Sequence, residues 1–418
     1  MRFLLFGDVA FNFEYTLLMQ WDKPREYPGL CIGNLETPIL LTGGEPRLKA
    51  GPNLSGYSQN FGTFRESFSH LLLNLANNHM MDYGLIGLQS TLALCKQHGV
   101  ITIGASTTLE LARSTHLIEL DGVRVGVLGR CETQFGIAEQ DRAGVAPLDA
   151  TIYHSIAQIR REVDIVIISI HGAAEMSPWP SPKWQDRLRS FIDAGADIVH
   201  GHHAHVPQGF EVYKNGFICY GLGNFLVNPS LWLSHPNTLW SLAIDLDVYK
   251  DQTDYACEIL VVELIEGRVL VRTVPRNEYT QYNIYIYLDQ CNKPLQDRQL
   301  LAGLWQEFAI RAYNLYFAKW LGFQSPSRSV YQSNKDCLYA SVRQVRRFLQ
   351  RRSKDTPPAV PDQSQYLLWY HLFACESHQD AITTALGVLG GELKDLRTVE
   401  TCRLADEMMP WSVQADNL

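Results

Sequence analysis

Short apolar segments alternate with amphipathic ones along the first two thirds of the chain. The apolar runs "RFLLF", "LCIG" and "DIVIISIH" predict buried strands. Apolar positions recur at helical spacing over 85–98, over about 149–162 and in "WQDRLRSFIDAG", which predicts three helices. Turn signals at Asp121-Gly122 and Asn215-Gly216 predict two hairpins. This alternation predicts an α/β fold with a mixed sheet or two stacked sheets.

The pattern changes after about Pro275, where long aromatic-rich segments with helical spacing replace the strands. A chain of 418 residues also exceeds the usual size of one hydrophobic core. We therefore expect two domains, residues 1–275 and a helical domain of unknown role over residues 276–418. The aromatic residues of the helical segments are predicted to pack in a core rather than to stack on a ligand: Trp305, Tyr313, Phe317, Trp320, Trp369 and Tyr370.

A basic run from Arg343 to Lys354 is followed by several prolines, which indicate a linker. A charged, solvated helix end is the main interpretation of this run, and contact with an acidic partner or a membrane surface is the alternative. The net charge of −8 and the pI near 5.9 argue against binding nucleic acid through a basic surface.

Cysteine usage and the amino terminus bear on where the protein works. Nine cysteines occur without a CxxC pair, mostly among apolar residues, which is typical of buried reduced thiols. The apolar run at the amino terminus stops at Gly7-Asp8, too early for a signal peptide, and no apolar stretch is long enough to span a membrane. The expectation is a soluble, cytoplasmic protein.

Polar residues that could bind a metal recur where predicted strands end. In open α/β sheets the strand ends form the crevice where ligands bind, so these side chains could converge. Each one alone is typical of a turn, a cap or a structural hydrogen bond, and only their joint occurrence favours a metal site. Carboxylate, imidazole and amide oxygen form a mixed ligand set. Such a set is better suited to binding Mn, Zn or Fe than to forming a cysteine-rich structural zinc site. The residues are Asp8, Asn34, Glu36, Asn77, Asn78, His79, His171, His202, His203 and His205.

The order of these motifs resembles that of a known family. The chain carries GD, NLE, "ANNHMMDYG", "HGAAE", "GHHAHVPQG" and "YGLGNF" in succession. This succession resembles the CapA family of capsule synthesis, also called the poly-γ-glutamate synthesis family, within the calcineurin-like metallophosphoesterase superfamily. The resemblance covers about residues 3–245 and does not extend to the last 140 residues. It implies two stacked mixed sheets flanked by helices.

The resemblance implies roles for particular residues. Asp8, Glu36, Asn78, His171, His203 and His205 match metal ligands for one or two divalent ions. His79 matches a histidine that stabilises charge developing on a phosphoryl oxygen, and Asp82 matches the aspartate that orients it. Asn34, Asn77, Glu175, His202 and Asn224 are predicted to bind substrate or to support the ligands. His200 is predicted to be structural.

One departure from the superfamily keeps the functional alternatives open. The phosphatases begin with D-x-H, whereas this chain has Ala10 in place of that histidine, so one tight and one loose metal are expected. The leading hypothesis is a metal-dependent phosphoesterase. A protein that binds or assembles an anionic polymer such as poly-γ-glutamate, and a hydrolase that cleaves an amide of that polymer, are the alternatives. No membrane anchor of the kind typical of the family is recognisable in the sequence.

Overall fold

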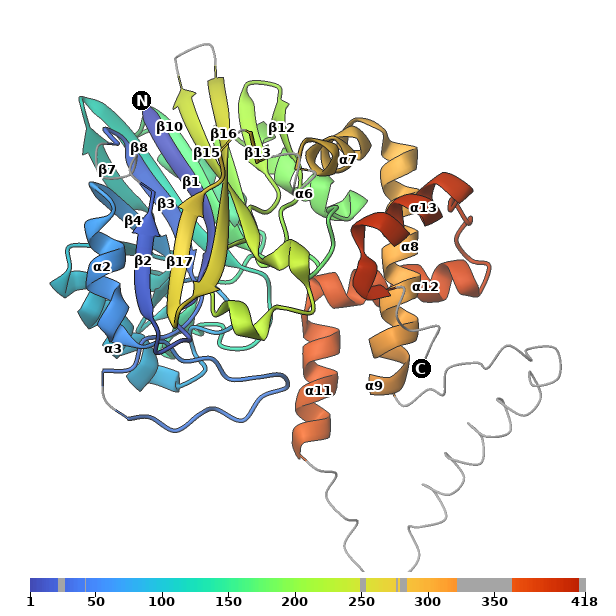
Figure 1. Cartoon of the computed structure of the whole chain (residues 1–418), viewed down its shortest axis with the longest axis horizontal. Helices are drawn as coiled ribbons and strands as arrows, with labels where there is room; N and C mark the ends of the chain where they lie inside the picture. The colour runs from blue at the N-terminus through green and yellow to red at the C-terminus, as the bar shows by residue number, and fades with distance from the viewer. Residues whose placement is uncertain are drawn as a thin grey trace, which may run out of the picture.

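The computed structural model describes residues 1–21, 27–41, 43–248, 253–275, 277–278, 284–321 and 363–412. The predicted basic run between Arg343 and Lys354 lies outside these residues. Two mixed sheets and a set of helices make up the described part of the chain (Figure 1).

The larger sheet has the strand order β2-β17-β16-β15-β1-β3-β4-β5, and β14 also pairs with β1. Strands β1, β3, β4 and β5 are parallel, while β15, β16 and β17 form an antiparallel extension. The strands are β1 (Arg2–Val9), β2 (Thr16–Gln20), β3 (Leu30–Leu35), β4 (His70–Asn74), β5 (Ile101–Ile103), β14 (Asn224–Leu226), β15 (Trp240–Val248), β16 (Thr253–Ile265) and β17 (Arg268–Thr273).

The smaller sheet has the order β12-β13-β11-β10-β8-β7, with a parallel centre formed by β8, β10, β11 and β13. Its strands are β7 (His116–Leu120), β8 (Val123–Cys131), β10 (Ile165–His171), β11 (Ile198–His202), β12 (Phe210–Tyr213) and β13 (Gly216–Cys219), and a separate pair is formed by β6 (Ala105–Ser106) and β9 (Gly144–Val145). Apolar side chains of both sheets, among them Leu5 and Ile167, belong to one buried cluster. The sheets therefore stack face to face, as the sequence predicts.

The helices between the strands are α2 (Phe61–Glu66), α3 (Gly84–Gln97), α4 (Leu109–Arg113), α5 (Thr151–Ile159) and α6 (Pro182–Asp193). The predicted helices α3, α5 and α6 are confirmed. α6 begins where the Ser181 side chain accepts a hydrogen bond from the Trp184 amide and Pro182 fits the first turn. α3 ends just before Gly99, which adopts φ +64°.

One hairpin turns as predicted and the other turns one residue earlier. Asp121 and Gly122 have φ of 52° and 77°, as the tight turn between β7 and β8 requires. In the second hairpin Tyr213 pairs with Gly216, so Lys214 and Asn215 form the turn. Gly216 is instead needed for packing, because a Cβ there would lie 2.6 Å from the Ile192 side chain of α6.

The described residues after Thr273 form helices and no strand, which confirms the predicted α-helical C-terminal region. These helices lie beside the sandwich, next to α6 (Figure 1). They are α7 (Ile284–Gln296), α8 (Arg298–Ala312), a π-helical turn (Tyr313–Phe317), α9 (Ala318–Trp320), α11 (Gln363–Ala374), α12 (Glu376–Leu389) and α13 (Val399–Met408), followed by a 3-10 turn (Pro410–Ser412). The division of the chain at residue 275 stays a prediction.

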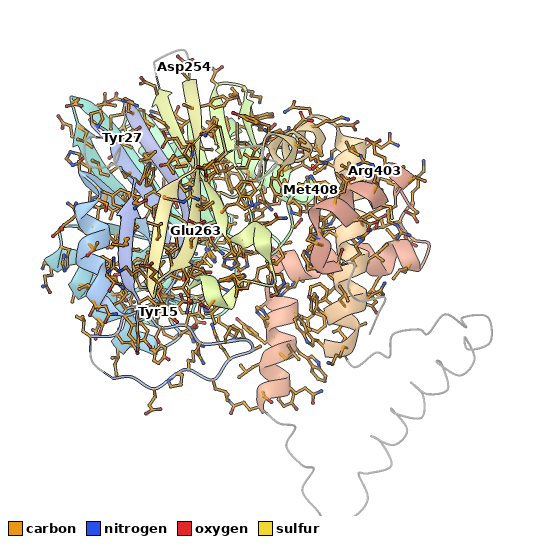
Figure 2. All side chains as sticks on the ribbon, in the orientation of Figure 1. Tyr15, Tyr27, Asp254, Glu263, Arg403 and Met408 are labelled. Carbon is orange, nitrogen blue, oxygen red and sulfur yellow. The ribbon has the colours of Figure 1, made fainter. Side chains whose placement is uncertain are left out.

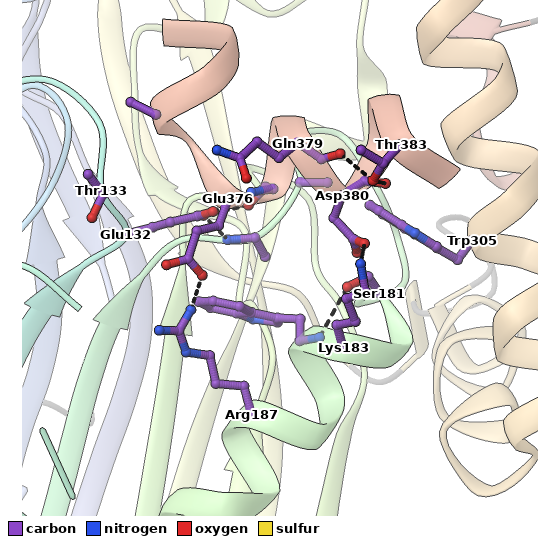
Figure 3. A pocket seen from close by; sticks show the side chains of 15 residues that line it. Glu132, Thr133, Ser181, Lys183, Arg187, Trp305, Glu376, Gln379, Asp380 and Thr383 are labelled. Carbon is purple, nitrogen blue, oxygen red and sulfur yellow. Dashed lines mark hydrogen bonds and ion pairs between the residues drawn. The ribbon is translucent and has the colours of Figure 1, made fainter. Parts of the chain in front are cut away.

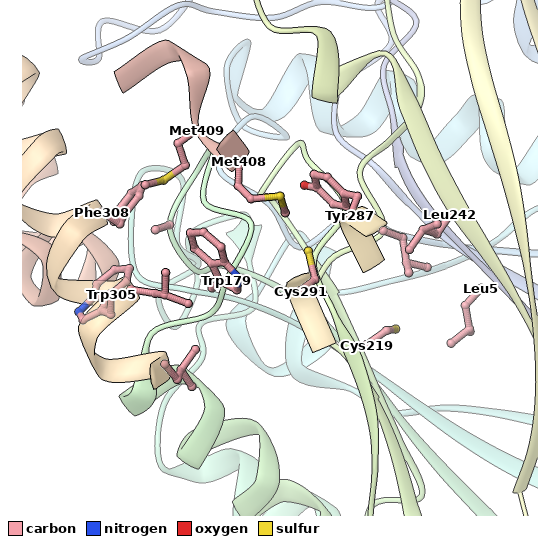
Figure 4. Packing of buried hydrophobic residues seen from close by; sticks show 14 of the residues in the cluster. Leu5, Trp179, Cys219, Leu242, Tyr287, Cys291, Trp305, Phe308, Met408 and Met409 are labelled. Atoms are coloured by element: carbon pink, nitrogen blue, oxygen red, sulfur yellow. The ribbon is translucent and has the colours of Figure 1, made fainter. Parts of the chain in front are cut away.

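Buried side chains join the C-terminal helices to the sandwich. Leu304 of α8 and Met408 of α13 lie in the same buried cluster as Leu5 of β1 (Figure 4). Trp179, which is 1% exposed, donates its indole N–H to the Gln290 carbonyl of α7 at 2.9 Å. On α13, Met408 points toward the sandwich while Arg403 points away (Figure 2). The helices are thus docked through an apolar interface.

The aromatic residues predicted to be core divide into two groups. Trp305, Tyr313 and Phe317 are buried, as expected. Trp320, Trp369 and Tyr370 are 38%, 38% and 49% exposed, so the prediction is wrong for these three. Helical spacing identifies a face of a helix but does not say whether another element covers it, and α9 and α11 leave part of their aromatic surface uncovered.

Candidate metal centre

The parallel strands of both sheets bring the predicted metal-binding residues to one place. β1, β3, β10 and β11 end near one another, and the loops that follow β4 and β11 lie at the same edge. β1 packs closely against the segment before β14 at Gly7. A Cβ added to Gly7 would lie 1.8 Å from the Gly223 carbonyl oxygen. Because only glycine fits there, β1 can approach β14 closely, and Asp8 pairs in register with Asn224.

Asp8 lies at the centre of a hydrogen-bonded group. Its carboxylate, 1% exposed, accepts hydrogen bonds from the Asn34 side chain at 2.9 Å and from the His203 amide at 3.2 Å. Nδ1 of His202 lies 3.4 Å from Oδ1, and Nδ1 of His205 lies 3.9 Å from Oδ2. Residues from β3, β11 and the loop after β11 therefore surround the carboxylate of Asp8.

Glu36, His203 and His205 form the group best arranged to hold a cation. Each offers one ligand atom, and these atoms all lie within 4.8 Å of one another. Nε2 of His205 is 3.6 Å from Oε1 of Glu36, and that oxygen is buried without a hydrogen-bond partner. Nδ1 of His203 is likewise buried without a partner. Buried polar atoms are nearly always paired, so these atoms indicate a ligand position.

His171 joins this group to two amides. Its Nε2 lies 3.0 Å from Oδ1 of Asn78 and 3.8 Å from Oε1 of Glu36, and its Nδ1 lies 3.3 Å from Nδ2 of Asn34. The rings of His171 and His203 are 4.6 Å apart between centroids. The six residues predicted as metal ligands are thus neighbours, although their roles remain predictions.

The backbone of the histidine loop is strained. His203 and His205 have φ of 90° and 58°, in the left-handed region that side chains other than glycine rarely adopt. Such conformations cost of the order of 1–3 kcal/mol and persist where the surroundings fix them. In this conformation both imidazoles lie near Glu36 and the His203 amide donates to Asp8, which favours a functional explanation for the loop.

Burial and neighbouring charges shift the pKa values of the buried groups in both directions. Burial raises the pKa of Glu36 to about 8, against the opposing effect of His205. Burial disfavours the charged form of His205, but Glu36, Asp8 and Glu175 together raise its pKa to about 9. The pKa of His171 falls well below its ordinary value through burial and the neighbouring histidines. His171 is therefore a neutral imidazole, the form that binds metals.

These observations fit a divalent metal ion. The donor set of two carboxylates, one amide oxygen and three imidazoles suits Mn, Zn or Fe. The unpaired Oε1 of Glu36 and Nδ1 of His203 are available to such an ion. The residues that could hold it are Asp8, Glu36, Asn78, His171, His203 and His205.

His79 and Asp82 lie beside this centre together with a lysine that sequence reasoning missed. Nδ1 of His79 is 2.7 Å from Oδ2 of Asp82. Lys49, whose side chain is 3% exposed, forms an ion pair with Oδ1 of Asp82 and lies 3.1 Å from Nδ1 of His79. Its ammonium also contacts the Asn78 carbonyl oxygen at 3.5 Å. Lys49 comes from the loop between β3 and α2, where no motif marks it.

The residues predicted to bind substrate or support the ligands occupy different positions. Asn34 and His202 contact Asp8, and Asn224 lies 3.0 Å from Nδ1 of His205. Asn77 is fully buried and holds the turn, because its Oδ1 accepts the amides of His79 and Met80. Glu175 lies 3.5 Å from Nε2 of His203, and half of its side chain is accessible.

The C-terminal helices contribute further residues that the motifs did not indicate. His371 of α11 stacks on Phe135 at 5.3 Å, and His371 and His378 lie 4.6 Å apart. The pKa of His378 is lowered by burial against the opposing charge of Glu175. Gln134 contacts Nε2 of His203 at 3.4 Å. In the sequence, only the two histidines His371 and His378, seven residues apart, could have indicated that the C-terminal helices contribute residues here.

A cavity of about 610 Å³ lies away from the metal-binding residues, between α6 and α12 (Figure 3). Lys183 pairs with Asp380 across it at 2.5 Å, and Arg187 pairs with Glu376. At its inner end the buried Glu132 accepts hydrogen bonds from the amide and hydroxyl of Ser377. This cavity marks the polar part of the junction between the sandwich and the C-terminal helices.

The similarity to known proteins lies mainly in the first half of the chain. The model of the bacterial capsule synthesis protein PGA_cap family matches residues 25–229. The capsule biosynthesis protein CapA of Bacillus anthracis is 34% identical over 205 residues, 46% of this chain and 49% of that protein. The PGA biosynthesis protein CapA of Bacillus subtilis is 30% identical over 198 residues, 46% of this chain and 52% of that protein. The chain spans about half the length of these curated relatives.

Among solved structures, a 5'-nucleotidase from Candida albicans aligns with a TM-score of 0.38 and 12% identity, over 62% of this chain and 51% of that one. In the part of the chain that the structure describes, no helix is both long and apolar enough to cross a membrane.

Proposed function

We propose that the chain, whose residues 25–229 match the model of the bacterial capsule synthesis protein PGA_cap family, is a metal-dependent hydrolase of phosphoesters. The observation that carries the proposal is the position of the His79–Asp82–Lys49 group beside the cluster of Glu36, His203 and His205. Holding a cation needs only the cluster. A buried imidazole held in place by an aspartate and a lysine is suited to donating or accepting a proton.

A divalent ion held by the six predicted ligands would lower the pKa of a water molecule and so supply a nucleophile near neutral pH. Asn34 orients two of these ligands, because its amide group contacts both Asp8 and His171. Asn224 orients a third by its contact with His205. Such neighbours fix the tautomer and ring orientation of the ligands.

His79 is proposed to act on the substrate through Nε2. The short contact between Nδ1 and Asp82 favours a proton on Nδ1, so a neutral ring presents the lone pair of Nε2 outward. Burial lowers the pKa of His79, Asp82 opposes this effect, and Lys49 adds to it. An incoming phosphoryl group brings negative charge that favours protonation of Nε2. The Nε2–H then donates to an oxygen on which charge develops.

The proposal is tested by metal analysis of the purified chain followed by a panel of phosphoesters with added Mn²⁺, Zn²⁺, Fe²⁺ or Co²⁺. We expect hydrolysis of at least one phosphoester, and expect Asp8→Ala and His203→Ala to lose both bound metal and activity. His154→Ala, on the exposed face of α5, is the matched control and keeps both. Wild-type protein that binds metal but cleaves no phosphoester with any of these ions contradicts the proposal.

A second candidate function is binding or assembly of an anionic polymer such as poly-γ-glutamate. It is favoured by Ala10 at the position of the superfamily histidine and by the names of the two Bacillus relatives, which refer to capsule and PGA biosynthesis. Equilibrium binding of fluorescent polyglutamate to the wild type and to His203→Ala distinguishes this function. Tight binding without hydrolysis supports it.

A further inference from the structure

A second cavity, of about 260 Å³, opens beside the metal-binding residues and is bounded largely by the C-terminal helices. Glu175 lies at the boundary between the two, since it lines the cavity while its Oε1 is 3.5 Å from Nε2 of His203. A group bound in the cavity would therefore lie next to the metal centre. The volume suits one small chemical group rather than a whole drug-sized ligand.

Aromatic rings form much of the wall. Phe308, Tyr316, Phe317, Trp320 and Trp411 all line the cavity. They form a connected set, with centroid separations of 6.0 Å for Phe308–Trp411, 6.1 Å for Tyr316–Trp411, 5.8 Å for Tyr316–Trp320 and 5.9 Å for Phe317–Trp320. Tyr316 and Trp320 are 40% and 38% exposed, so these rings are accessible to a ligand.

The cavity has one acidic side chain among its described lining residues. Glu175 places a carboxylate at the wall of the cavity. Half of that side chain is accessible. Neither lysine nor arginine is among the described residues that line the cavity, and the basic side chains there are those of His235 and His378. Among the described residues the cavity thus combines aromatic rings with a carboxylate and has no lysine or arginine.

We propose that this cavity is a binding site for a compact organic ammonium group, of the kind that choline carries. The faces of aromatic rings attract cations, and several rings together with a carboxylate recognise quaternary ammonium groups. An uncharged apolar group would fill the space between the rings. It would leave the carboxylate of Glu175 without a partner of opposite charge on the side that faces the cavity. The site is defined by binding and does not require hydrolysis at the metal centre.

Calorimetric titration of the full chain with choline, and with its carbon isostere in which a tert-butyl group replaces the trimethylammonium group, tests the proposal. Choline should bind about 10-fold more tightly than the isostere, which corresponds to about 1.4 kcal/mol and lies between the values for exposed and desolvated cation–π contacts. Equal affinity for the two compounds, or no binding of choline, overturns the proposal.

Two variants and a matched control locate the site. Trp320→Leu and Glu175→Gln should each weaken choline binding about 10-fold. Trp369→Leu removes an equally exposed tryptophan, 38% in both cases, from α11 outside the cavity and should leave affinity unchanged. Metal content is measured in each variant. If the Glu175→Gln variant loses both its metal and choline binding, Glu175 belongs to the metal centre and the proposal is overturned. If the variant retains its metal and binds choline more weakly, the proposal is supported.

Discussion

At the scale of single residues, substitution of His79 distinguishes the proposed catalysis from metal binding. Its imidazole contacts Asp82 and Lys49 and is not among the six predicted ligands. We expect His79→Ala to keep a normal metal content while turnover of a phosphoester falls about 10²–10³-fold, as for the loss of one donor to developing charge. Metal analysis and steady-state kinetics on the same preparation provide the measurement. Loss of the metal would make His79 a ligand, and full activity would make it structural.

Lys49 is the residue whose charge acts most directly on His79. It lowers the pKa of His79, whereas Asp82 raises it. Lys49→Met removes the lowering effect, so the pKa of His79 should rise above its wild-type value. Titration of the histidine Cε1–H resonances by NMR, with His79 assigned from the spectrum of His79→Ala, gives this shift. Lys183→Met, which removes an exposed lysine paired with Asp380, should leave the His79 resonance where it is.

At the scale of elements, Glu132 anchors the start of α12 to the end of β8. Burial raises its pKa from 4.5 to about 7, against the opposing hydrogen bonds from Ser377 and Ala173. A carboxyl group whose pKa is raised by folding stabilises the native state most below pH 4.5, and that contribution is lost as the pH rises toward 7.

The free energy of unfolding of the wild type, minus that of Glu132→Gln, should therefore fall by on the order of 3 kcal/mol over this interval. Urea unfolding at a series of pH values measures the difference. Glu139→Gln, at an exposed position, controls for the loss of one carboxylate. A difference that rises with pH would show that the hydrogen bonds to the carboxylate dominate over its burial.

At the scale of the whole molecule, the sandwich and the C-terminal helices share one buried cluster. Leu304 of α8 is 0% exposed within it. Leu304→Ala should lower the free energy of unfolding by about 2–5 kcal/mol and shift the unfolding of both parts together. Calorimetry combined with hydrogen exchange in β10 and α12 checks this. Two separate transitions, with only the helical one shifted, would instead favour two independently folding domains divided near residue 275.

Much of the fold and of the candidate site follows from local sequence pattern. Apolar runs indicated β1, β3 and β10, because a strand covered on both faces must be apolar along its length. The polar residues at their ends indicated where a ligand would lie, since parallel strands end at one edge. The motifs resemble those of the CapA family, and the family match over residues 25–229 confirms this resemblance. The resemblance supplied the predicted role of each residue in the site.

Tertiary structure alone decided what depends on segments distant in sequence. Lys49 reaches His79 from a loop 30 residues earlier, and His378 of α12 lies near Glu175 although about 200 residues separate them in the sequence. The aromatic cavity exists because the helices pack on the loop after β10, where the Trp411 indole donates to the Met176 carbonyl at 3.2 Å. Sequence periodicity records which side of an element is apolar, a short-range property. Which surfaces meet, and which rings stay uncovered, is set by long-range packing that no local pattern encodes.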